Sequence, residues 1–255
     1  MPLRTITSII AILLITNPLS AKEMVLETGT SQNYMIELYT SEGCSSCPPA
    51  EHFLNEFKNK ADLWDRVIPM AFHVDYWDYI GWKDRFAQAV FSRRQHGYAQ
   101  LQRRSTVYTP AFFINGINWR PGFFFKRLPT NNQKKIGSLK VTLKENTITA
   151  RFNPLKKKAA LYNLNIALLG TGITTHIKAG ENKGRKSTHE FVVLNHQQYR
   201  SHNLKWKVNW SPLTQQIKSL SVSDYAIAAW INTENNLSPI QATGGYLPDY
   251  FLKKQ

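Results

Sequence analysis

Cys44 and Cys47 are the only two cysteines of the 255-residue chain, and they lie in one Cys-Ser-Ser-Cys motif. A disulfide stabilises a protein mainly by closing a long loop of the unfolded chain. A disulfide between these two cysteines would close a very short loop, so it would add little stability. The motif therefore predicts chemistry, namely thiol–disulfide exchange, with an incidental structural disulfide as the alternative.

The residues around the motif predict a strand, a turn and a helix. Residues 34–39 are mostly apolar, and the turn-forming residues 40–43 follow them. Two prolines come directly after Cys47, where the first turn of a helix tolerates them. This arrangement places Cys44 at a helix N-terminus, where the helix dipole stabilises a thiolate. We expect Cys44 to be the nucleophile and Cys47, about one turn further in, to be the resolving thiol.

Residues 66–74 predict a second buried strand. A strand, helix, strand order of this length implies a right-handed crossover to a parallel neighbour, so His73 is expected at the sheet edge that carries Cys44. Two thiolates and an imidazole suit copper(I) or zinc. A metal-binding or metal-delivery protein that uses Cys44, Cys47 and His73 is therefore one alternative. A histidine held by hydrogen bonds is favoured, however, and we assign no metal ligand.

Residues 83–104 predict a helix, and residues 107–119 predict a hairpin. Asn115-Gly116 lies between two apolar segments of this hairpin and is typical of a tight turn, because both central residues need positive φ. Residues 75–82 combine aromatic and acidic side chains, as partner-binding surfaces often do. A non-enzymatic binding module is thus a further alternative, although packing of these rings between two domains is favoured, because an exposed patch this aromatic would promote aggregation.

The second half of the chain alternates apolar and polar residues, which predicts short strands and a β-sandwich-like domain. Gly180 to Arg185 lies between two of these strands. This segment is either an ordinary hairpin tip or a loop that extends over the dithiol. The predicted strands cover residues 139–143, 148–152, 160–169, 173–178, 190–195, 203–208 and 224–232.

Residues 1–21 are typical of a secretory signal peptide, with Arg4 before an apolar segment and small residues at the end. We therefore expect a periplasmic or secreted protein with no stable membrane insertion after cleavage. The formal net charge is +15, but the basic residues are scattered and the one tight run is Lys156 to Lys158. Scattered charge favours a solvated surface, and no nucleic acid partner is expected.

The order of strand, Cys-x-x-Cys, helix, strand, helix and hairpin over residues 33–120 resembles the thioredoxin fold. This resemblance implies that the proline before the hairpin is cis and packs against the dithiol. Pro110 is the matching residue, and Thr109 precedes it. The resemblance also implies a buried acid on the first strand, so Glu37 is a candidate general base for Cys47.

Four segments resemble a family of secreted bacterial proteins catalogued as domain of unknown function 1223. This resemblance implies a thioredoxin-like domain followed by a β-rich domain. We therefore predict a signal peptide (1–21), an α/β thioredoxin-like domain (22–137) and an all-β, sandwich-like domain (138–255). The four segments are ELYTSEGCSSCPP at 37–49, FHVDYWDYIGWKD at 72–84, VYTPAFFING at 107–116 and GENKGR at 180–185.

Together these features predict a thiol–disulfide oxidoreductase of the bacterial cell envelope. Its partners would be protein thiols or disulfides, and no cofactor is expected. The residues Ser45-Ser46 between the cysteines do not indicate whether it acts as a reductase, an oxidase or an isomerase, because reduction potential depends on how the folded protein stabilises the thiolate.

Overall fold

The computed structural model describes residues 22–120, 128, 134–156, 160–212 and 214–252. The predicted signal peptide lies outside the described residues. No helix among those residues is long and apolar enough to cross a membrane.

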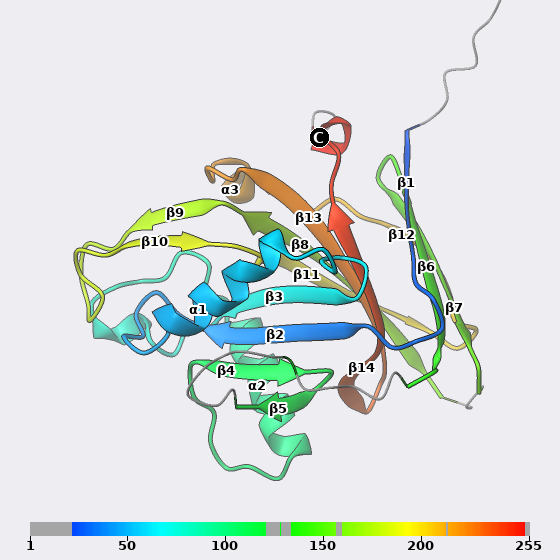
Figure 1. Cartoon of the computed structure of the whole chain (residues 1–255), viewed down its shortest axis with the longest axis horizontal. Helices are drawn as coiled ribbons and strands as arrows, with labels where there is room; N and C mark the ends of the chain where they lie inside the picture. The colour runs from blue at the N-terminus through cyan, green and yellow to red at the C-terminus, as the bar shows by residue number, and fades with distance from the viewer. Residues whose placement is uncertain (1–21, 121–127, 129–133, 157–159, 213, 253–255) are drawn as a thin grey trace, which may run out of the picture.

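One large mixed sheet organises the protein (Figure 1), with the strand order β14-β13-β8-β11-β3-β2-β4-β5. At its centre, β3 (Val67–His73) runs parallel to β2 (Tyr34–Thr40) and to β11 (Val192–Ser201). The sheet also contains β4 (Ala111–Ile114), β5 (Ile117–Trp119), β8 (Tyr162–Thr171), β13 (Asp224–Thr233) and β14 (Asn236–Tyr246).

Two smaller sheets flank the large one. The first has the order β1-β6-β7-β12, and the second is the pair β9 and β10. Their strands are β1 (Glu23–Glu27), β6 (Gly137–Lys144), β7 (Thr147–Pro154), β12 (Lys205–Asn209), β9 (Ile173–His176) and β10 (Lys186–His189). The helices are α1 (Pro48–Asn55), α2 (Ala89–Leu101), α3 (Gln215–Lys218) and α4 (Asp249–Leu252), with 3₁₀ turns η1 (Glu56–Asn59) and η2 (Asp78–Ile80).

Side chains on both faces of the large sheet are buried. On β8, Leu164, Ile166 and Leu168 pack with the four-stranded sheet, whereas Ala167 and Leu169 pack with the core under α2. This is the alternation expected along a strand. Helix α1 packs over β2 and β3 through a third cluster that includes Ile36, Leu38 and Phe53.

The predicted fold class, an α/β thioredoxin-like domain followed by an all-β sandwich-like domain, is wrong. Strand accounts for 46% of the described residues and helix for 16%, and one sheet contains strands from both halves. The reason is the parallel pairing of β11 with β3, in which Val192 lies opposite Ala71. This contact joins residues more than a hundred positions apart, so no local pattern reveals it. The sheet crosses the predicted boundary at residue 137, and the division into two domains stays a prediction.

Several local predictions are confirmed. The strand at 34–39, the strand at 66–74 and the hairpin at 107–119 are present as β2, β3 and β4-β5. Asn115 and Gly116 both have positive φ, as the tight turn requires. The Thr109–Pro110 peptide bond is cis.

A buried ion pair connects α2 to the sheet. Both carboxylate oxygens of Glu37 on β2 accept hydrogen bonds from Arg94, at 2.8 and 3.2 Å. The hydroxyls of Tyr39 and Tyr98 donate to the same carboxylate at 3.0 and 2.5 Å. Glu37 is fully buried, so its charge depends on these partners for compensation.

We expect the variant Arg94→Met to lose about 3–5 kcal/mol of unfolding free energy, because it leaves the Glu37 carboxylate buried without its cation. Urea denaturation monitored by tryptophan fluorescence measures this loss. The neighbouring exposed Arg93 provides the control, since Arg93→Met should change stability by no more than about 0.5 kcal/mol. Equal effects of the two substitutions would contradict the role assigned to the ion pair.

Candidate functional site

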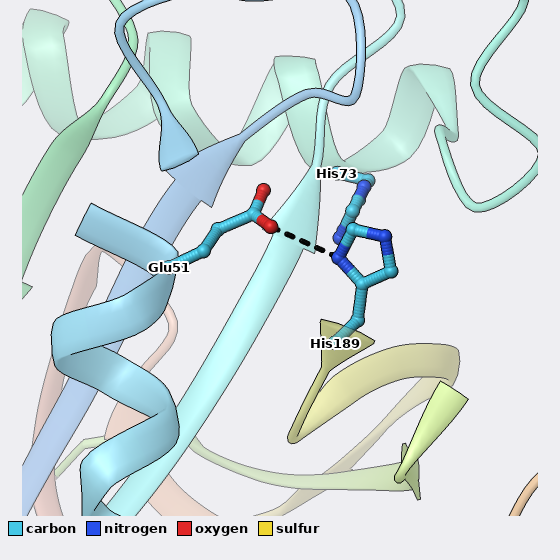
Figure 2. Close-up of side chains that lie close together, drawn as sticks. All are labelled: Glu51, His73 and His189. Carbon is cyan, nitrogen blue, oxygen red and sulfur yellow. Dashed lines mark hydrogen bonds and ion pairs between the residues drawn. The ribbon is translucent and has the colours of Figure 1, made fainter. Parts of the chain in front are cut away.

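Several elements meet at one edge of the large sheet. Strand β3 ends at His73, strand β10 ends at His189, and helix α1 begins at Pro48. Figure 2 shows His73, His189 and Glu51 of α1 converging from these three elements. The parallel pairing of β2 with β3 brings the ends of both strands, Thr40 and His73, to the same edge, as the sequence predicted.

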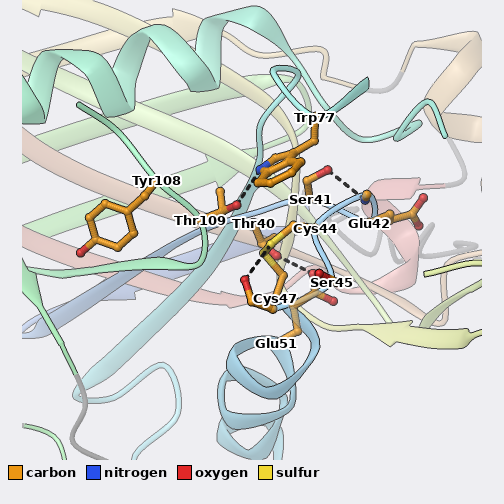
Figure 3. Close-up of a disulfide and its surroundings, with 12 residues drawn as sticks. Thr40, Ser41, Glu42, Cys44, Ser45, Cys47, Glu51, Trp77, Tyr108 and Thr109 are labelled. Carbon is orange, nitrogen blue, oxygen red and sulfur yellow. Dashed lines mark hydrogen bonds between the residues drawn. A yellow bond between two sulfur atoms is a disulfide. The ribbon is translucent and has the colours of Figure 1, made fainter. Parts of the chain in front are cut away.

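Cys44 and Cys47 form a disulfide in the loop between β2 and α1 (Figure 3). Cys47 is the N-cap residue of α1, and the two prolines that follow occupy the first turn. Both cysteines are buried, whereas Ser45 and Ser46 between them are exposed. The Cys44 sulfur lies 3.4 Å from the Ser46 hydroxyl oxygen. Within the Cys-Ser-Ser-Cys segment, the two serines are therefore the residues exposed to solvent, and the disulfide lies beneath them.

The β9–β10 connection lies against the disulfide loop. Asn182 is buried and donates hydrogen bonds from its side-chain amide to the carbonyls of Glu42 and Cys44, both at 2.9 Å. The Ser45 N–H donates to Glu181 at 3.2 Å. The segment at 180–185 is thus a hairpin tip that also contacts the dithiol loop, which combines the two alternatives left open by the sequence.

Thr109 lies beside the disulfide, as Figure 3 shows. Its hydroxyl accepts a hydrogen bond of 2.7 Å from the indole N–H of Trp77. Trp82 donates in the same way to Glu42 at 2.8 Å. The aromatic segment at 75–82 is therefore partly engaged in the site, and of its rings Tyr79 is the one with large exposure, at 82%.

Glu37 is placed differently from the other predicted residues. Its described hydrogen bonds go to Arg94, Tyr39 and Tyr98, and none of them involves a cysteine. The acid that lies one helical turn after Cys47 is Glu51, and its backbone N–H donates to the Cys47 carbonyl at 3.1 Å. The role of Glu37 as general base stays a prediction.

Two buried histidines and three buried acids lie next to the disulfide loop. His189 is hydrogen-bonded through Nδ1 to Glu51 at 2.9 Å and through Nε2 to Glu42 at 3.1 Å. His73 is hydrogen-bonded through Nδ1 to Asp84 at 2.6 Å. The two imidazole rings are 5.4 Å apart. We call these five residues the edge cluster.

The edge cluster also fixes the loop that carries the cysteines. Asp84 accepts hydrogen bonds from the backbone N–H groups of Glu42 and Phe86, both at 2.9 Å. Thr40 donates to Glu51 at 2.6 Å. Both ends of the Cys-Ser-Ser-Cys segment are therefore tied to buried charge.

Burial and pairing act against each other on the pKa values of this cluster. Burial lowers the pKa of His189, but the carboxylates of Glu51 and Glu42 outweigh it and raise that pKa to about 10. Burial likewise opposes protonation of His73, and Asp84 reverses the effect so that the pKa of His73 is raised. For Glu51 and Asp84, burial is outweighed by the adjacent imidazole, and both carboxyl pKa values are lowered. Each imidazole is thus paired with at least one carboxylate, and this pairing favours its protonated form.

Sequence reasoning selected His73 but missed Glu42, Glu51, Asp84 and His189 as site residues. Glu42 and Asp84 lie within the family motifs, and Glu51 follows the first motif closely. Their position in or near these motifs was the available signal that they belong to a site. The histidines show no metal-ligand spacing along the chain, because β3 and β10 bring them together only in the folded protein. Among the described residues, the group whose donor atoms could hold a metal ion consists of Glu51, His73 and His189.

A groove between α1 and β10 opens beside the cluster. Its volume is about 290 Å³. Glu51 is 9% exposed and lines this groove. The other lining residues are Pro48, His52, Asn55, Arg185, Lys186, Ser187 and Thr188.

The fold and the site define a mixed-sheet protein that carries a disulfide and a buried histidine–carboxylate cluster at one sheet edge. Residues 35–231 match the family described as protein of unknown function, DUF1223. The chain belongs to this family, which confirms the resemblance seen in its motifs. No curated protein matches the chain.

Two solved structures share the fold. A protein from Agrobacterium tumefaciens is 21% identical and has a TM-score of 0.62, with 86% of this chain and 96% of that protein covered. HBP35 of Porphyromonas gingivalis is 12% identical and has a TM-score of 0.54, with 86% and 76% covered. At these identities the similarity concerns the fold.

We expect Asn182→Ala to increase the rate at which dithiothreitol reduces the Cys44–Cys47 disulfide, because it removes both side-chain hydrogen bonds that hold the β9–β10 connection to the disulfide loop. The loss of partners for two carbonyls should also cost about 1–3 kcal/mol of stability. Stopped-flow thiol assays and urea denaturation measure these effects. The exposed neighbour Lys183 provides the control, and a reduction rate equal in Asn182→Ala and Lys183→Ala would contradict the prediction.

The raised pKa of His189 predicts that stability falls in alkaline solution. The stabilisation from its imidazolium is fully present below about pH 6.5, the ordinary histidine pKa, and is lost as the pH rises towards about 10. His73 acts in the same direction. In the presence of a chelator, unfolding free energy should fall over this range by up to about 1.4 kcal/mol per pH unit for each proton involved.

Urea denaturation at several pH values, with His189→Gln and the exposed-site variant His52→Gln, tests this prediction. The alkaline slope should flatten in His189→Gln and remain in His52→Gln. A slope that is the same in all three proteins would show that His189 is not the titrating group.

Proposed function

We propose that this protein catalyses thiol–disulfide exchange through Cys44 and Cys47. The observation that carries the proposal is the disulfide itself, which joins two residues three positions apart at the start of α1. A bridge of this span constrains the unfolded chain little. The large buried sheet supplies the stability of the fold, so the disulfide is available for chemistry.

In the reduced protein, the Cys44 thiolate attacks one sulfur of a partner disulfide. A new bond forms between Cys44 and that sulfur, and the partner's other sulfur leaves as a thiolate. The Cys47 thiolate then attacks the Cys44 sulfur, which re-forms the internal disulfide and releases the partner's second thiolate. Two electrons pass from the dithiol to the partner, and the reverse sequence oxidises a partner dithiol.

The local environment favours Cys44 as the attacking sulfur. It precedes the N-terminus of α1, whose dipole stabilises negative charge, and the Ser46 hydroxyl lies 3.4 Å from its sulfur. Cys47 is the N-cap residue of the helix and is buried, as Cys44 is. The position of Cys44 and its contact with Ser46 support the assignment of Cys44 as nucleophile and Cys47 as resolving thiol.

Access to the disulfide supports a protein partner. A substrate must approach over Ser45 and Ser46, which are exposed, and beside Thr109, whose cis peptide bond to Pro110 lies at the start of β4. An extended segment with a disulfide or dithiol fits this position. With the signal peptide proposed for residues 1–21, the partners are protein thiols or disulfides of the cell envelope.

The alternative of copper or zinc bound by Cys44, Cys47 and His73 has less support. Both sulfurs are consumed in the disulfide, and His73 groups with Glu51 and His189 instead. The alternative of a non-enzymatic binding module rests on the 75–82 segment, where Trp77 and Trp82 are engaged in hydrogen bonds within the site. Neither alternative explains why a disulfide occupies this loop.

The proposal predicts different outcomes for the two cysteine variants. Cys47→Ser should accumulate a mixed disulfide between Cys44 and glutathione, because the resolving thiol is missing, and mass spectrometry detects this product. Cys44→Ser should form no such product and should reduce insulin disulfides no faster than dithiothreitol alone. The variant Ser45→Ala alters an exposed residue of the same loop and should retain turnover.

Insulin turnover that survives in Cys44→Ser would contradict the proposal. So would a wild-type protein whose disulfide, once exposed to a thiol under native conditions, neither opens nor exchanges. Circular dichroism of each variant establishes that loss of exchange is not loss of the fold.

A further inference from the structure

We propose that Glu51, His73 and His189 form a binding site for a divalent transition metal ion, zinc in the first instance, and that this site is separate from the dithiol. The donor set is two imidazole nitrogens and one carboxylate oxygen. It differs from the alternative of a metal bound by Cys44, Cys47 and His73, and the experiments below distinguish the two.

The three donor atoms come from different elements and lie close together. They are all within 4.8 Å of one another, and all three residues are buried. A tetrahedral zinc ion binds nitrogen and oxygen donors at about 2.0–2.2 Å, which places the donors roughly 3.4 Å apart. The donor atoms are therefore within about 1.4 Å of that spacing, and Figure 2 shows the three side chains lying close together.

Each of the three side chains is oriented by a further buried group. Asp84 accepts from Nδ1 of His73, which leaves Nε2 as the donor to a metal. Glu42 contacts Nε2 of His189, which leaves Nδ1 on the side of Glu51. Thr40 donates to Glu51 Oε1, so Oε2, which pairs with Nδ1 of His189 at 2.9 Å, is the oxygen on the side of the histidines. Carboxylate–histidine–metal arrangements of this kind are typical of zinc sites.

One atom of the cluster points independently to a ligand. Nε2 of His73 is completely buried and has no hydrogen-bond partner among the described residues. Buried polar atoms are nearly always satisfied, because an unmade hydrogen bond costs free energy. The ring of His73 lies beside that of His189, with centroids 5.4 Å apart. A metal ion between the three donor atoms would satisfy this nitrogen.

The formal charge of the cluster suits a divalent cation. Glu42, Glu51 and Asp84 are buried carboxylates that contact the two imidazoles. A divalent cation bound by neutral imidazoles would compensate two of their three negative charges.

The donor chemistry favours zinc over the harder and softer ions. Magnesium and calcium select oxygen donors, and copper(I) selects sulfur, whereas two imidazoles with one carboxylate are a common zinc set that leaves a fourth position for water or another ligand. The groove lined by Glu51, His52 and Asn55 leads to the cluster and provides an entry path.

Metal titration of the oxidised protein tests the proposal. After treatment with a chelator, the wild type should bind one zinc ion in calorimetry and should give the visible spectrum of a tetrahedral ion with cobalt(II). The near-isosteric variant Glu51→Gln and the variant His189→Gln should each weaken zinc binding at least about 100-fold. Asp84→Asn, which alters an orienting partner, should weaken it about 10–100-fold.

Two controls separate this site from other sources of binding. His52→Gln changes an exposed histidine, with a side chain 81% exposed, next to Glu51 and should bind zinc as the wild type does. The double variant Cys44→Ser, Cys47→Ser removes the dithiol and should also retain zinc. X-ray absorption of the zinc-loaded wild type should show nitrogen and oxygen ligands without sulfur, a readout that does not require any substitution.

The proposal is overturned by a wild type that binds no zinc, by undiminished binding in Glu51→Gln and His189→Gln, or by sulfur in the metal's coordination shell. Loss of zinc in the double cysteine variant would overturn it in favour of the dithiol site. None of these outcomes affects the insulin-reduction and mixed-disulfide tests, so the two proposals can fail separately.

Discussion

The parallel pairing of β3 with both β2 and β11 is the constraint on which the rest of the site depends. All seven residues of β3 are buried, and the strand is paired with β2 along its length and with β11 at Ala71. Its last residue, His73, is therefore buried together with its polar ring. A buried imidazole requires partners, and Asp84, placed by the turns that follow η2, is one of them. The polar character of the sheet edge follows from where this strand ends.

The buried charged groups of the edge cluster share hydrogen-bond partners. Asp84 pairs with His73 and also accepts the Glu42 N–H, so the same carboxylate supports the strand end and the entrance to the disulfide loop. Glu42 and Glu51 then enclose His189 from the two ends of that loop. The cysteines lie between Glu42 and Glu51 in the sequence, so the disulfide loop and the two histidines are neighbours at this sheet edge.

Local structure could be predicted from the sequence, whereas the architecture could not. The Asn115-Gly116 turn and the strands β2 and β3 depend on residues within a few positions of one another, and each was predicted. Strands β1 and β14 were missed, since β1 pairs with β6 and β14 pairs with β13 at a sheet edge and neither has a strong apolar pattern. Strands β11 and β3 are paired at one position, where Val192 lies opposite Ala71. Such non-local pairing is set by how whole faces pack, so two local patterns were interpreted as two folds.

The candidate acid near the dithiol illustrates why spacing decides function. Side chains alternate along a strand, so Glu37 and Tyr39 share the face covered by α2, where the tyrosine hydroxyl donates to the carboxylate. Thr40, three positions after Glu37, lies on the opposite face and donates to Glu51 of α1. Glu37 therefore faces α2 and is hydrogen-bonded to Arg94. The acid on the α1 side is Glu51, one helical turn after Cys47, and its carboxylate is hydrogen-bonded to His189.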